Sequence, residues 1–155
     1  MKKSTKIIMA AIAALIALTA VFVIIHSATR TEVPDEALLV SCGGEKKYVD
    51  LKSLNAIHVQ GSVVNGKGEK SDIDTQGVPL ADVIKNAGFD PSGAAAVKVT
   101  ADDEFSAELS GDELNEAGKV YLISEDDGSM RLVVFGDSNA KRSVRNVVSV
   151  EISVK

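Results

Sequence analysis

An apolar run near the N-terminus constrains this chain most, because it divides the sequence into two kinds of structure. Residues 7–25 are nineteen consecutive residues, all apolar except Thr19. A helix of that length spans roughly 28 Å, close to the roughly 30 Å of bilayer hydrocarbon. A cleaved secretory signal has a shorter apolar stretch, of about 7–15 residues. We therefore predict an uncleaved membrane anchor within residues 1–34, with secretion after signal cleavage as the alternative.

The charges around this run predict its orientation and the character of the rest of the chain. Lys2, Lys3 and Lys6 precede the run, so the N-terminus is expected in the cytoplasm and residues 35–155 outside it, held at the cell membrane by a single pass. Residues 1–34 hold four of the 17 basic and one of the 22 acidic residues, which leaves 13 basic and 21 acidic residues, a net −8. Such an acidic domain is not expected to bind nucleic acid.

The pattern of residues 35–155 predicts an α+β domain that is mainly β. The last strand is the clearest, because Val144, Val148, Val150, Ile152 and Val154 alternate with more polar residues and so define one buried face. Strands are expected at 37–41, 47–51, 56–64, 95–101, 105–109, 120–124, 130–135 and 143–154.

Two or three short helices are expected between these strands, and two of them have clear signals. Leu80, Val83, Ile84 and Ala87 form one apolar stripe in a helix over residues 78–88, with Pro79 in its first turn and a glycine at its end. The Ser110–Glu113 spacing of a capping box predicts the start of a second helix. The polar residues 65–76 are predicted to form a long loop.

The usual catalytic and metal-binding patterns are missing from residues 35–155. One histidine, His58, and one cysteine, Cys42, are too few for a hydrolytic triad or a tetrahedral zinc site. Cys42 is expected at the end of the first strand, although Leu39–Cys42 also resembles a bacterial lipobox. The acidic residues 102–104 and 126–127 are interpreted as solvated turns, with a calcium site as the alternative for 102–104. No catalytic residue and no metal ligand is predicted.

One basic cluster differs from the acidic background. Lys141, Arg142 and Arg145 place three cations within five residues at the entry to the last strand. Guanidinium and ammonium groups in such an arrangement could hold a small anion such as phosphate through charge-assisted hydrogen bonds. The alternative, which spacing alone favours, is a solvated strand entry paired to the acidic surface.

Four segments in chain order resemble the oxidoreductase molybdopterin-binding domain of the sulfite oxidase family. They are GVPLADVI at 77–84, FSAEL at 105–109, MRLVVFGD at 130–137 and KRSVRNVVSVEI at 141–152, within a match over about residues 55–153. The resemblance implies that family's fold after the N-terminal helix, and a molybdenum centre held by a pterin dithiolene and one cysteine. It also implies a set of candidate cofactor-binding residues, namely Lys141, Arg142, Arg145, His58 and Ser62.

The sequence departs from this family at the residues that matter for redox chemistry. The place of the ligating cysteine is taken by Gly61 or Ser62, and neither supplies a soft thiolate. Phe135 and Asn146 replace a proline and a tryptophan of the family pattern, and the family's enzymes are longer. We therefore expect a non-catalytic relative without cofactor, which binds a ligand, a small anion or a protein partner. The alternative is a reduced molybdopterin-dependent oxidoreductase.

Overall fold

The computed structural model describes residues 12, 15–17, 19, 21, 37–65 and 67–154. The chain divides into two compact units, Met1–Val33 and Pro34–Lys155. Most of the anchor predicted at residues 7–25 lies outside the described residues. Those described within it are helical, and the Thr19 hydroxyl donates to the carbonyl oxygens of Leu15 and Ile16, at 3.1 and 2.9 Å. Among the described residues, no helix is both long and apolar enough to span a bilayer.

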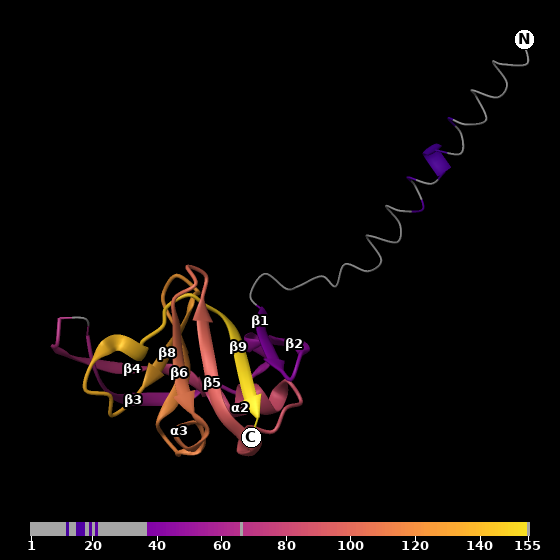
Figure 1. Cartoon of the computed structure of the whole chain (residues 1–155). Helices are drawn as coiled ribbons and strands as arrows, with labels where there is room; N and C mark the ends of the chain where they lie inside the picture. The colour runs from indigo at the N-terminus through magenta and orange to yellow at the C-terminus, as the bar shows by residue number, and fades with distance from the viewer. Residues whose placement is uncertain are drawn as a thin grey trace, which may run out of the picture. The chain divides into compact units, whose positions relative to one another are not determined.

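The second unit is mainly β, with short helices, and contains two sheets (Figure 1). The five-stranded sheet has the order β2-β1-β9-β5-β6 and is antiparallel except where β1 runs parallel to β9. Its strands are β1 Ala37–Cys42, β2 Glu45–Asp50, β5 Ala94–Ala101, β6 Ser106–Ser110 and β9 Val147–Val154. The four-stranded antiparallel sheet has the order β3-β4-β7-β8 and contains β3 Ile57–Val64, β4 Lys70–Pro79, β7 Val120–Ser124 and β8 Met130–Val134.

Local sequence signals account for the two α-helices. Helix α2, Leu80–Asn86, buries its apolar stripe and ends before Gly88, whose φ of 87° suits glycine. Pro79 precedes this helix instead of lying in its first turn. Helix α3, Gly111–Asn115, begins with the predicted capping box, in which both the Ser110 and the Glu113 bonds are present. Single 3-10 turns are η1 Leu51–Ser53, η2 Pro91–Gly93 and η3 Ala140–Arg142.

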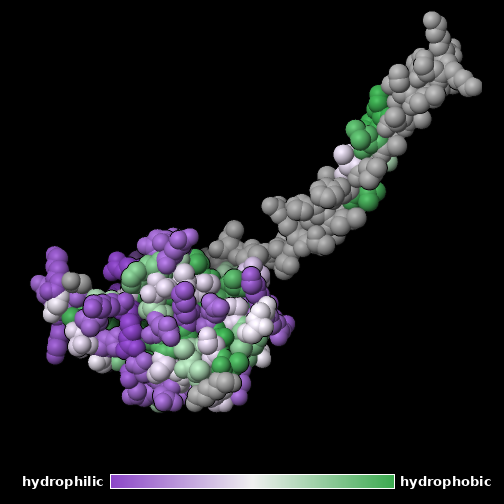
Figure 2. All heavy atoms as spheres, in the orientation of Figure 1, coloured by the Kyte–Doolittle hydropathy of each residue, from purple (hydrophilic) through white to green (hydrophobic). Residues whose placement is uncertain are grey.

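The main hydrophobic core joins both sheets and α2. Fully buried members include Val40 of β1, Val97 of β5 and Leu132 of β8. A second, smaller cluster is made by Val63, Ile73, Ile123 and Val133 of the four-stranded sheet, with Tyr121 and Phe135 packed against it. Because neighbouring residues of a strand point to opposite faces, this sheet carries apolar side chains on both faces. Figure 2 shows that the visible surface of the unit is mostly hydrophilic.

The long loop predicted at residues 65–76 is wrong, because β4 begins at Lys70. This strand pairs with β3 from Val64 opposite Lys70 to Ile57 opposite Gly77. The connecting turn is closed by the Asn65 side chain, which accepts from the amides of Lys67 and Glu69 at 2.9 and 3.0 Å. In the first half of β4, charged side chains point to solvent around the buried Ile73, and the next buried residues are Gly77 and Val78, so the strand carries little apolar periodicity.

The buried face predicted for the last strand is only partly correct. Strand β9 begins at Val147, after Asn146 adopts a φ of 51°, and its register with β5 shifts between Thr100 and Ala101. Val147 is therefore buried, whereas Val148 is 46% exposed. Val150 and Ile152 are buried as predicted, and Val154 at the end of the strand is 58% exposed.

Candidate binding cleft

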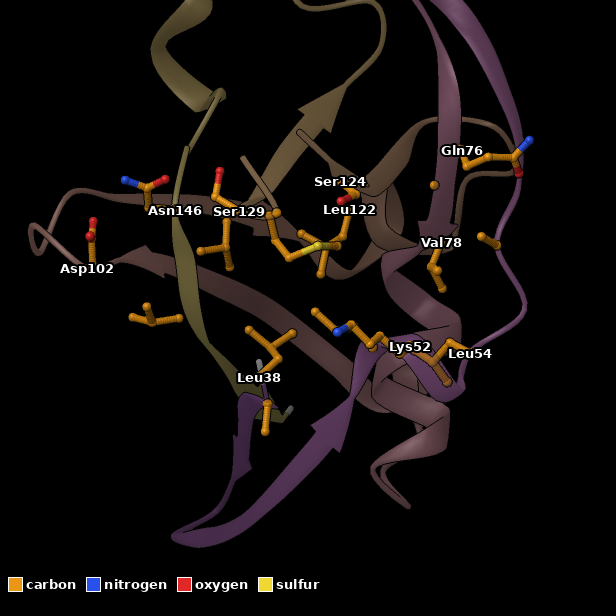
Figure 3. A pocket seen from close by; sticks show the side chains of 18 residues that line it. Leu38, Lys52, Leu54, Gln76, Val78, Asp102, Leu122, Ser124, Ser129 and Asn146 are labelled. Atoms are coloured by element: carbon orange, nitrogen blue, oxygen red, sulfur yellow. The ribbon is translucent and has the colours of Figure 1, made fainter. Parts of the chain in front are cut away.

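A cleft of about 840 Å³ lies between the two sheets, where several strands begin or end (Figure 3). The five-stranded sheet contributes the start of β1 and of β9. The four-stranded sheet contributes the ends of β4 and β7 and the start of β8. The 3-10 turn η1 and the β5–β6 and β7–β8 turns complete the walls. The cleft therefore depends on segments that are far apart in the sequence.

The lining of the cleft is largely apolar. Leu38, Val78 and Leu122 form an inner part that is at most 5% exposed, and they belong to the main core. Met130, half-buried, packs against the same core, and Val148 at the start of β9 is exposed. The remaining apolar lining residues are Ala37, Leu51, Leu54, Ala56 and Val147. An apolar surface that continues from the core to solvent is suited to a ligand with an apolar body.

A pair of polar residues, Asp102 and Asn146, lies at one side of the cleft. The Asp102 amide donates to the Asn146 carbonyl oxygen at 3.0 Å, which joins the β5–β6 turn to the start of β9. Neither side chain forms a hydrogen bond or an ion pair within the described part of the chain, and the same is true of Gln76. In Figure 3, Asp102 and Asn146 lie on the opposite side of the cleft from Lys52. Ser124 and Ser129 are the other polar side chains of the lining.

Carboxylates hold Arg142, the central residue of the predicted basic cluster. The Arg142 guanidinium donates to both oxygens of Asp137, one of them at 2.9 Å from Nε, and its Nη1 donates to both oxygens of Glu113 at 2.9 and 2.8 Å. The hydrogen bond to Asp137 is the main reason why the Arg142 pKa is raised above its usual value. Burial alone would raise the pKa of Glu113. The bonds from Arg142 and from the Ser110 amide, with the positive charges of Arg142 and Lys119, outweigh burial and lower it.

The other predicted site residues lie apart from this arrangement. Arg145 is 67% exposed, with its Nε 3.9 Å from Glu125, and the Lys141 side chain is exposed. His58 on β3 lies 3.4 Å from Asp74 of β4, and Ser62 is exposed on β3. In the described part of the chain, no hydrogen bond or ion pair links any two of the five predicted residues, and none of them lines the cleft. Their cofactor-binding role stays a prediction.

The residues near the family's cysteine position do not fit a thiolate-held molybdenum centre. A Cβ at Gly61 would lie 2.6 Å from Cε1 of Phe135, so a cysteine would fit there only if the Phe135 ring shifted. Ser62 offers only a hard oxygen. Cys42 is in β1 opposite Glu45, packs against the main core and does not line the cleft. Among the described residues, no three histidine, cysteine or acidic side chains group closely enough to hold a metal.

Sequence reasoning missed the cleft itself. The sequence pattern predicts a solvated turn at Asp102 and marks Asn146 only as a replacement for a family tryptophan. One signal was available, since Asn146 interrupts the alternation of the last strand, and asparagine is one of the few residues that tolerate a positive φ.

Neither the known protein families nor the curated proteins include a match to this chain.

Proposed function

We propose that residues 35–155 form an extracytoplasmic domain, held at the membrane by residues 7–25, that binds a small ligand in the cleft without redox chemistry. The cleft is the observation that carries this proposal. Its volume of about 840 Å³ falls within the roughly 300–1,000 Å³ of small-molecule sites. Its composition, apolar with a few polar groups, is also typical of such sites.

The packing of the cleft supports ligand binding over a purely structural role. The inner residues Leu38 and Leu122 are already buried by the protein itself, so the open cleft contributes nothing to the burial of the core. The cleft nevertheless leaves Val148 46% exposed and keeps polar side chains at its edge. A ligand with an apolar body would remove that apolar surface from water, at about 25 cal/mol for each Å² buried.

We also propose that the domain is a non-catalytic relative of the sulfite oxidase molybdopterin-binding fold. The packing of Gly61 under Phe135 supports the loss of the metal ligand. The membrane anchor rests on the apolar run and on the lysines before it. Metal analysis of protein purified from its own host separates this proposal from the alternative, because stoichiometric molybdenum would establish a reduced oxidoreductase.

Ligand binding can be tested through Met130, which lines the cleft and is the only methionine after residue 9. The full chain is labelled with ¹³C-methyl methionine, placed in lipid nanodiscs and titrated with 1-hexanol. A Met130→Leu variant identifies the signal. We expect a saturable shift of the Met130 methyl resonance, because an apolar ligand in the cleft contacts this side chain.

A matched pair of variants makes this test specific. Ala56 is an exposed residue of the cleft lining, so Ala56→Trp adds a bulky ring at the cleft wall and should weaken the shift strongly. Ala95 is exposed on β5 outside the cleft, and Ala95→Trp should leave the shift unchanged. A shift that does not saturate, or that is equal in both variants, would refute the proposed function.

A further inference from the structure

We propose that the cleft selects ligands that combine an apolar body with a cationic, hydrogen-bond-donating head group, of which a primary ammonium is the simplest. This inference rests on the proposed function and adds the chemical class of the ligand. It is carried by the pair Asp102 and Asn146, which presents a carboxylate and an amide group at the edge of a largely apolar site.

The backbone holds this pair in place. Asn146 has a φ of 51°, a conformation that residues other than glycine rarely adopt, and it lies immediately before β9. Its carbonyl oxygen accepts from the Asp102 amide at 3.0 Å. The β5–β6 turn is further fixed by Asp103, whose carboxylate accepts from the Phe105 amide at 3.0 Å. Backbone conformations of this kind concentrate at binding sites, where surrounding structure maintains them.

The hydrogen-bonding capacity of the acidic and hydroxyl side chains that line the cleft favours a donor. The Asp102 carboxylate has no partner among the described residues, and a carboxylate can only accept. The Ser129 hydroxyl already donates to Asp127 at 2.6 Å, so it presents only lone pairs to the cleft. The Ser124 hydroxyl is directed to the Glu125 carbonyl oxygen at 3.4 Å. A ligand ammonium beside Asp102 would therefore meet a negative charge and an acceptor that no other described residue uses.

The apolar part of the site lies beside these acceptors. Leu38, Val78, Leu122 and Met130 line the same cleft, so a short alkyl chain can lie against them while its head group stays near Asp102. Lys52 also lines the cleft, on the side opposite to Asp102 in Figure 3. This lysine provides a competing prediction, since a carboxylate head group would be attracted to Lys52.

Three probes of equal chain length separate these possibilities. Hexylamine, 1-hexanol and hexanoate are titrated at low salt and neutral pH into the labelled full chain in nanodiscs, and dissociation constants are read from the Met130 methyl shift. We expect hexylamine to bind about three- to tenfold more tightly than 1-hexanol, the range for one charge-assisted contact with an exposed carboxylate. Raising the salt concentration should reduce this preference.

Two variants assign the preference to the pair. Asp102→Asn removes the charge and should make hexylamine and 1-hexanol bind equally, whereas the neighbouring Asp103→Asn, which keeps the acceptor for the Phe105 amide, should preserve the preference. Asn146→Gly retains the backbone conformation and should weaken hexylamine binding alone. Equal binding of all three probes, or tighter binding of hexanoate, would overturn this inference and leave the proposed function standing. No saturable shift with any probe would refute the proposed function as well.

Discussion

Arg142→Ala should destabilise the second unit strongly, because Arg142 joins two distant parts of it. Its guanidinium binds Asp137, five residues earlier, and Glu113 of α3, which is 29 residues away in the sequence. The side chains of Arg142, Asp137 and Glu113 are 27%, 16% and 24% exposed. Removing the arginine would therefore leave two partly buried carboxylates without their main partner, which is costlier than losing a surface ion pair.

The expected loss of unfolding free energy follows from the partial burial of these three side chains. A hydrogen bond to a charged group is worth about 1.5–3 kcal/mol, and solvent screening at partly exposed sites reduces that value. We expect a total loss of about 2–3 kcal/mol, which corresponds to a fall in Tm of roughly 6–15 °C for a domain of this size. Tyrosine fluorescence of the full chain during heating measures it, since the protein has no tryptophan and both tyrosines, Tyr48 and Tyr121, lie in strands of the second unit.

The neighbouring lysine provides the control. Lys141 is exposed and its side chain forms no ion pair among the described residues, so Lys141→Ala should change stability by less than about 0.5 kcal/mol. The reasoning would be refuted if Arg142→Ala were as stable as Lys141→Ala. It would also be refuted if phosphate raised the Tm of the wild type but not that of Arg142→Ala, because Arg142 would then serve as an anion site.

Three further outcomes are expected. Burial tends to raise the pKa of Glu113, but the bonds from Arg142 outweigh it and lower this pKa. The ionised Glu113 therefore stabilises the fold above about pH 4.3, and this stabilisation is lost as the pH falls through the pKa of the folded state. Glu113→Gln should make the free energy of unfolding depend less on pH in acid urea titrations. Gly111→Ala should cost about 2 kcal/mol or more in the same assay, despite better helix propensity, because its Cβ would lie 1.9 Å from a β5 carbonyl oxygen. Gly61→Cys should cost about 1–3 kcal/mol by displacing Phe135, without gain of molybdenum on metal analysis.

Much of the fold could be predicted from the sequence because its signals are local. The Ser110 capping box and the glycine after α2 mark helix ends through contacts within one turn. The mainly β character of the domain follows from short apolar runs separated by turn residues. The two sheets and their strand order could not be predicted in this way, because they depend on pairing between distant strands, such as the parallel contact of β1 with β9.

The errors occurred where a strand lacks the expected pattern. Strand β4 buries Ile73 between charged neighbours, and its partner β3 supplies the hydrogen bonds that its own composition does not indicate. Strand β9 was given the wrong face at its start, because one residue with a positive φ shifts which side chains point inward. In β4 the pairing with a neighbouring strand determined the structure, and in β9 a single backbone conformation did, so strand propensity was not decisive in either.

The cleft shows why candidate binding residues are harder to predict than the core. Its apolar wall uses residues that any packing of these two sheets would bury, such as Leu38 and Leu122, so their sequence signal is that of a core. Its polar edge lies in turns, at Asp102, Ser129 and Asn146, where acidic and amide residues are expected for solvation alone. Because these turns can change without disturbing the core, a chain can retain the signatures of a fold while its ligand differs from that of the fold's enzymes. The sequence resemblance to the sulfite oxidase family is therefore a prediction about the scaffold, whereas the ligand that we propose is inferred from residues in the turns.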